Sequence, residues 1–116
     1  MIKLKSLLIE EAVMTLDAAQ QLANRLDKEI NAPYVRAYIS TLGGKERPSV
    51  MLTVSLDDQK SWPNNILHNS RWMMFDIAYD GTIVQHARDS KVKNFRKSRF
   101  TEPDQVINKI NTYLKT

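Results

Sequence analysis

The sequence contains no cysteine, and its 116 residues include only two histidines, His68 and His86. The absence of cysteine excludes disulfide bonds, thiolate nucleophiles and cysteine-ligated zinc or iron–sulfur sites. With two histidines, few combinations of a nucleophile and a general base are possible. The histidines, carboxylates and other polar residues also show no spacing typical of a metal site. We therefore expect no catalytic residues, no metal and no cofactor.

The sequence also lacks long apolar runs. None approaches the roughly 20 residues that a membrane-spanning helix requires. The first residues, Met1-Ile2-Lys3-Leu4-Lys5, do not have the long apolar segment or the small-residue cleavage site of a signal peptide. These absences predict a cytoplasmic protein that does not enter a membrane, and they leave its oligomeric state open.

The overall composition is that of an ordinary folded protein. Hydrophobic residues make up 42% of the chain and charged residues 26%, both close to globular averages. A chain of 116 residues is the usual size of one domain. Since no repeat or low-complexity tract interrupts it, we expect residues 1–116 to form a single α+β domain.

Two segments have the periodicity of amphipathic helices. Between residues 15 and 31, apolar residues recur at helical spacing and Thr15 stands where an N-cap is expected. Residues 101–114 repeat this arrangement, with Thr101 as the cap and Pro103 in the first turn. Residues 4–14 are compatible with a helix or a strand; their composition favours a first helix that breaks near Thr15.

Between the helices the periodicity changes from 3.6 to 2, which indicates strands. Residues 34–41 and 50–56 alternate on either side of a polar turn, and residues 71–79 and 82–88 flank Asp80-Gly81. The dipeptide Asp-Gly is typical of a two-residue type I′ turn. The sequence therefore predicts an antiparallel four-stranded sheet of two hairpins, with the N-terminal helical segment and the C-terminal helix packed on one face.

A two-residue turn at Asp80-Gly81 also fixes which residues of the second hairpin lie opposite one another. On one face the predicted pairs are Ile77 with Val84, Phe75 with His86, and Met73 with Arg88. On the other face, Trp72, Met74, Asp76 and Ala78 should lie opposite Asp89, Ala87, Gln85 and Ile83, respectively. His86 is thus expected to face the core as a structural residue.

The sheet face away from the helices is expected to carry aromatic side chains. If the apolar residues of the first hairpin face the helices, Tyr34, Arg36 and Tyr38 face outward, together with Trp72 and Met74. Aromatic rings beside arginine can stack on bases or anchor a protein partner. Alternatively, these rings pack beneath the N-terminal segment or the long loop predicted between residues 57 and 70.

The positive charge of the chain is concentrated in residues 88–101, which we name the basic segment. The formal net charge of the whole chain is +4, and this segment alone contributes +5, since Asp89 is its one acid. Its basic residues are Arg88, Lys91, Lys93, Arg96, Lys97 and Arg99. Polar residues and the rings of Phe95 and Phe100 lie between them. The pattern fits a solvated connector, and it also fits a phosphate-binding surface.

One sequence feature is typical of an enzyme. Asp57-Asp58-Gln59-Lys60 follows a predicted strand, where metal-dependent nucleases place an acid and a lysine. Such a site needs a further acid, and the nearest candidate, Glu46, falls in a turn. The same four residues also fit a hydrophilic strand exit, which is the interpretation we favour.

Two functional hypotheses follow. The first is a small non-enzymatic nucleic-acid-binding protein, in which the basic segment neutralises phosphates while Tyr34, Arg36, Tyr38 and Trp72 stack or form hydrogen bonds. The second is a small interaction factor, such as a phage or mobile-element inhibitor or adaptor, that binds a larger host protein through the exposed sheet or the long loop.

Overall fold

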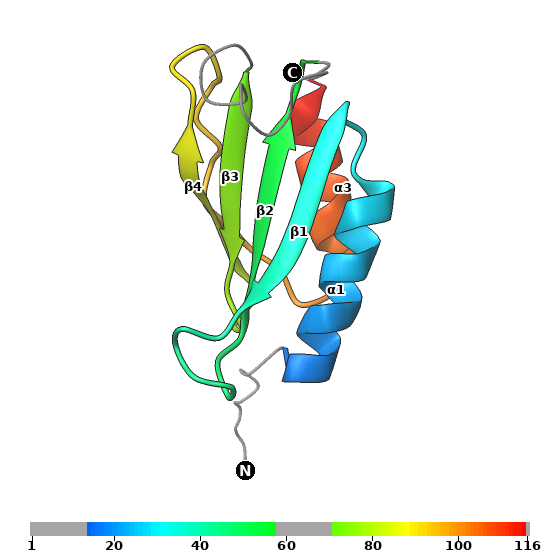
Figure 1. The fold of residues 1–116 in the computed structure, drawn as a ribbon, viewed down its shortest axis with the longest axis vertical. Helices are drawn as coiled ribbons and strands as arrows, with labels where there is room; N and C mark the ends of the chain where they lie inside the picture. The colour runs from blue at the N-terminus through cyan, green and yellow to red at the C-terminus, as the bar shows by residue number, and fades with distance from the viewer. Residues whose placement is uncertain (1–13, 58–70, 116) are drawn as a thin grey trace.

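A computed structural model of the protein describes residues 14–57 and 71–115 (Figure 1). Two predicted features therefore lie outside the described residues. They are the first helical segment up to residue 13 and the long loop from residue 58 to 70, which includes Asp58 and Lys60 of the nuclease-like motif. Along the chain the elements are α1 (Leu16–Glu29), β1 (Tyr34–Ser40), β2 (Ser49–Ser55), β3 (Trp72–Ile77), β4 (Thr82–Arg88), β5 (Ser98–Arg99) and α3 (Pro103–Leu114).

The strands form one antiparallel sheet in the order β1-β2-β3-β4-β5, so each strand pairs with its neighbours in the sequence. Both helices lie on the same face of this sheet (Figure 1). They are joined by Arg25, which bonds to Asp104 at 2.8 Å, and by Asn111, whose amide bonds to the backbone of Glu29 and Asn31. The α+β architecture is confirmed, but the prediction of four strands is wrong, because the described residues form a sheet of five.

The predicted α1 helix is confirmed with its cap. The hydroxyl of Thr15 accepts a hydrogen bond of 3.1 Å from the backbone N–H of Ala18 and so satisfies one of the free donors at the helix start. The buried face consists of Ala19, Leu22, Ala23 and Leu26. None of the helices within residues 14–57 and 71–115 has the length and hydropathy needed to cross a bilayer.

The α3 helix begins two residues after the predicted Thr101. Glu102 is the N-cap and Pro103 the first helical residue, where its missing N–H costs nothing. The side-chain oxygen of Gln105 accepts hydrogen bonds from the backbone N–H groups of Thr101 and Glu102, at 3.1 and 3.4 Å. Gln105, rather than the threonine hydroxyl, therefore organises the helix start.

The first predicted hairpin is present, and its apolar residues share one face of the sheet. Val35, Ala37 and Ile39 of β1 lie opposite Val54, Leu52 and Val50 of β2. The three β2 side chains are fully buried beneath the helices. Strict alternation over seven residues in each strand is enough to specify this face, because a slip of one residue would expose every apolar side chain.

The second hairpin differs from the prediction near its turn. The backbone N–H of Ala78 bonds to the carbonyl of Thr82 at 2.8 Å, so the loop contains three residues, Tyr79, Asp80 and Gly81, instead of two. Gly81 has a φ of 88°, as the last residue of such a loop requires. Ile77 consequently pairs with Ile83, and Asp76 with Val84, one residue away from the predicted partners.

A β-bulge then restores the predicted register further along. Phe75 pairs with Gln85 and Met74 with Ala87, which leaves His86 as the extra residue of β4. The predicted pairs Met73–Arg88 and Met74–Ala87 are confirmed. His86 is exposed instead of facing the core, and Gln85 lies on the helix side instead of the open side.

The core is one cluster between the sheet and the helices, and it extends into the basic segment. Val92 and Phe95 of that segment are only 8% and 7% exposed. The ring of Phe95 meets the rings of Phe75 and Tyr113 edge to face, with centroids 5.0 and 5.1 Å apart. The ring of Phe95 therefore belongs to the core and is not available to stack on a ligand.

Candidate functional site

The basic segment is fixed to the body of the protein by its apolar residues. It leaves β4 after Arg88 and returns to the sheet as β5, and its trace can be followed in Figure 1 from yellow to orange. Val92 and Phe95 are buried, whereas Lys91, Lys93, Arg96 and Lys97 are exposed. Because Val92 and Phe95 are anchored in the core, the side chains between and after them point toward solvent.

Gln85 holds the backbone of this segment by hydrogen bonds at both ends of its amide. Its oxygen accepts a bond of 3.0 Å from the N–H of Phe95, and its nitrogen donates to the carbonyl of Lys93 and to the hydroxyl of Tyr113. The Tyr113 hydroxyl also donates to the carbonyl of Lys93. The polypeptide between residues 93 and 95 is thereby tied to both β4 and α3.

Two of the six predicted cations serve the fold. Arg88 donates to the side chain of Asn94 at 2.6 Å and to the carbonyl of Asp89 at 3.2 Å. Arg99 donates to the carbonyl of Asp80, in the β3–β4 loop, at 3.1 Å. These guanidinium groups brace the two ends of the basic segment.

The other four cations have no acidic partner in contact. Within residues 14–57 and 71–115, the ion pairs are those of Arg25 with Glu29 and Asp104 and of Arg71 with Asp57. Lys91, Lys93, Arg96 and Lys97 are in none of these. Hydrogen bonds from Arg71 lower the pKa of the Asp57 carboxyl, and Lys91 lies close enough for its charge to contribute. The charges of Lys93, Arg96 and Lys97 are therefore the ones most available to an anion from outside the protein.

A fifth cation joins them from α3 and was not predicted. The ammonium of Lys109 lies 5.9 Å from the centre of the Phe95 ring, over its face. The sequence held a signal for this position, because Lys109 precedes Tyr113 by four residues and so shares its side of the helix. The sequence does not show that the basic segment lies beside Lys109, because that depends on the packing of Phe95 against Tyr113.

The predicted aromatic residues lie on the opposite side of the sheet, which we name the open face. Tyr34, Arg36 and Tyr38 project from β1, and Tyr34 is aligned with Trp72 of β3 through Ser55. Two strand spacings separate β1 from β3, about 10 Å. Tyr38 is 45% exposed and Arg36 is exposed, while Tyr34 and Trp72 are half-buried.

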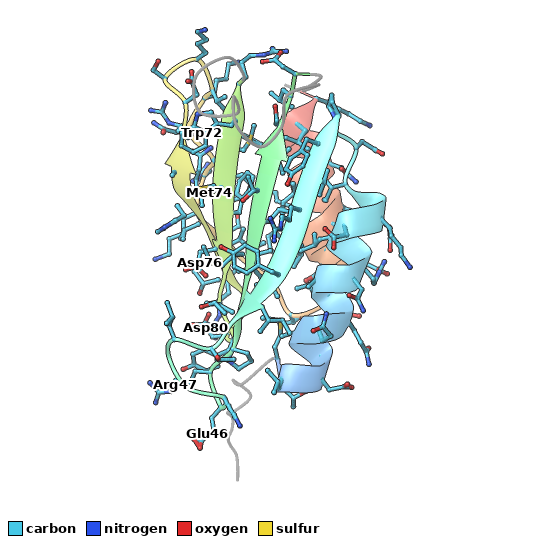
Figure 2. All side chains as sticks on the ribbon, in the orientation of Figure 1. Glu46, Arg47, Trp72, Met74, Asp76 and Asp80 are labelled. Atoms are coloured by element: carbon cyan, nitrogen blue, oxygen red, sulfur yellow. The ribbon has the colours of Figure 1, made fainter. Side chains whose placement is uncertain are left out.

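The structure therefore divides the predicted site into two surfaces. Figure 2 shows Trp72, Met74 and Asp76 along the open face. The basic segment instead packs through Phe95 against Phe75 and Tyr113 on the helix side. The cations and the aromatic residues do not form one continuous surface, so each set must be considered by itself.

A shallow groove with a volume of 610 Å³ crosses the open face. Its lining includes Tyr38, Met51, Met74, Asp76, Tyr79 and His86. On the same face, Trp72 Nε1 and Asp76 Oδ1 are buried, and neither has a hydrogen-bond partner among the described residues. Buried polar atoms without partners are uncommon in folded proteins and are frequently functional.

The described part of the nuclease-like motif has a structural role. Asp57 accepts a 2.5 Å hydrogen bond from the backbone N–H of Arg71 and pairs with its guanidinium at 3.0 Å. These bonds hold the pKa of Asp57 below its ordinary value. Glu46 precedes the start of β2 and Asp57 follows its end, about 20 Å away, so the two carboxylates cannot share a metal. No cluster of three metal-binding side chains occurs in the described ranges.

Comparison with protein-family models, with curated proteins and with solved structures found no match to this chain. What the two surfaces bind is therefore inferred from their own geometry and charge.

Proposed function

We propose that this protein binds nucleic acid, holding the sugar–phosphate backbone on its basic segment. The observation that supports this is the set of four exposed cations, Lys91, Lys93, Arg96 and Lys97, whose side chains form no ion pair with a carboxylate of the described residues. Nucleic acid is the common cellular ligand that offers a row of phosphates. No catalytic step is part of the proposal.

Two physical effects favour phosphate binding here. Neutralising phosphates releases condensed counterions, which supplies most of the affinity of a basic surface for nucleic acid. The backbone that carries Lys93 and Arg96 is already fixed by Gln85 and Tyr113, so less conformational entropy is lost on binding. Because phosphates are the same in every sequence, we expect little sequence preference.

The experiment that tests this proposal is a fluorescence-anisotropy titration of labelled single- and double-stranded DNA and RNA at several salt concentrations. We expect micromolar or tighter binding at about 50 mM salt. If four phosphates are neutralised, the slope of log K against log salt should be about −3, from about 0.7 to 0.9 per contact. An absence of binding at low salt would contradict the proposal.

A second candidate function is supported by the open face, where a larger protein could dock. The exposed Tyr38 and the methionines of the groove would be covered by such a partner. Trp72 Nε1 and Asp76 Oδ1 are buried without partners, and they would gain hydrogen bonds if docking moved the side chains that cover them. An inhibitor or adaptor of phage or mobile-element type that binds a host protein would use a surface of this kind.

This candidate predicts that Asp76 is kept for a partner and not for the fold. Asp76→Thr should raise the free energy of unfolding of the isolated protein by about 1 kcal/mol, because a buried carboxylate oxygen without a partner is removed. The control is Asp80→Ala, which removes the acceptor for the N–H of Thr82 at 2.9 Å and should lower stability. Urea unfolding measures both, and a destabilised Asp76→Thr protein would remove the support for this candidate.

A further inference from the structure

We infer that Lys109 and Thr112 of α3 complete a phosphate-binding pocket together with Lys93, Asn94 and Arg96 of the basic segment. The inference rests on the proposed function and deepens it, since it assigns one backbone phosphate of a nucleic-acid strand to a defined place. It also adds a helix to a surface that the sequence located in the basic segment alone.

The pocket has a volume of 260 Å³, and its walls come from two elements that are distant in the sequence. One wall is formed by residues 93–96 and the other by Lys109, Thr112 and Tyr113. Three cations and the polar side chains of Asn94 and Thr112 therefore surround it. Most of the exposed lining is apolar, so the attraction for an anion comes from the three cations and from the absence of a carboxylate among the described residues that line the pocket.

The aromatic residues of the pocket are not arranged to stack on a base. Phe95 is 7% exposed, and the ammonium of Lys109 lies over the face of its ring. Tyr113 directs its hydroxyl to the carbonyl of Lys93 and packs its ring against Phe95. The pocket therefore offers positive charge for a phosphate group but no free ring face on which a base could stack.

The pocket is held in place before any ligand binds. Gln85 fixes the N–H of Phe95 and the carbonyl of Lys93, so the residues on either side of Asn94 cannot move independently of β4. Val106, Ile107 and Ile110 bury the opposite side of α3 in the core. The spacing between the lysine and arginine of the segment and the lysine of the helix is thus set by the fold.

The test compares Lys109→Gln with Lys45→Gln in the full chain, using a labelled single-stranded DNA 20-mer. Both variants lose one positive charge, and Lys45 lies exposed in the β1–β2 turn, at the far end of the molecule from the start of the basic segment (Figure 1). We expect Lys109→Gln to weaken binding about fivefold at about 0.1 M salt and to reduce the salt slope by about 0.7. Lys45→Gln should change the affinity less than twofold.

Equal effects of the two variants would overturn the inference, because Lys109 would then act only through the net charge. If Lys93→Gln weakens binding and Lys109→Gln does not, the proposed function stands and the pocket is wrong. A chemical-shift titration with inorganic phosphate separates the remaining cases. Shifts at residues 93–96 and 109 without any oligonucleotide binding would support the pocket and contradict the proposed function, whereas no response to either probe would contradict both.

Discussion

Replacing Lys93, Arg96 and Lys97 together by glutamine should weaken binding to a single-stranded oligonucleotide about 100-fold at about 0.1 M salt. Each phosphate contact to single-stranded nucleic acid contributes about 0.7 to the salt slope, so three lost contacts reduce the slope by about 2. The folded structure should be preserved, because all three side chains are exposed and make no side-chain hydrogen bond within the described residues. Anisotropy titrations at several salt concentrations measure both quantities.

The matched control for this variant removes the same charge elsewhere. Lys28, Lys45 and Arg47 are exposed residues outside the basic segment, and like the test variant they comprise two lysines and one arginine. Their joint replacement by glutamine lowers the net charge equally but leaves the proposed surface intact. A comparable loss of affinity in the control would mean that binding depends on total charge, and the basic segment would no longer be a defined interface.

Gly81→Ala should strongly destabilise this protein. Gly81 has a φ of 88°, and a β-carbon added there would lie 1.8 Å from the carbonyl oxygen of Phe100. That oxygen belongs to the backbone just after β5, and the N–H of Phe100 bonds to the carbonyl of Gly81 at 2.9 Å. Because neither side can yield without moving backbone, we expect a loss of about 2–4 kcal/mol in the free energy of unfolding.

Gly44→Ala provides the comparison for this prediction. Gly44 also has a positive φ, 101°, but no atom lies within 4 Å of an added β-carbon. Gly44→Ala should therefore lower the free energy of unfolding by only about 1 kcal/mol, the cost of placing alanine at a positive φ. Urea unfolding gives the loss of stability for each variant, and the difference between the two losses is the energetic cost of the clash with Phe100. Equal losses would show that β5 can move away from this loop at little cost.

The parts of the fold that the sequence predicted are those with strict periodicity. The stripe of α1 and the alternation of β1 and β2 repeat over enough residues for one face to be specified. In the second hairpin, Asp80-Gly81 is compatible with loops of two or three residues, and nothing in the local sequence distinguishes them. The bulge at His86 compensates for that choice, so it could not be predicted separately.

The candidate site was predicted only in part for a similar reason. A run of basic residues is evident in the sequence, but which of them face solvent depends on where Phe95 packs. Phe95 enters the core between Phe75 and Tyr113, residues 20 and 18 positions away. Two-residue strands such as β5 have no periodicity to detect, so the return of the basic segment to the sheet was also missed.

The short length of β5 has a consequence for how copies of this protein behave toward each other. β5 pairs only with Thr82 and Ile83, so the outer edge of β4 beyond them has no strand neighbour within the described residues. Unpaired strand edges favour intermolecular β-pairing and aggregation, and nearby lysines oppose it by repulsion. The cations of the basic segment follow β4 along this edge, so we expect their mutual repulsion to oppose self-association at high concentration.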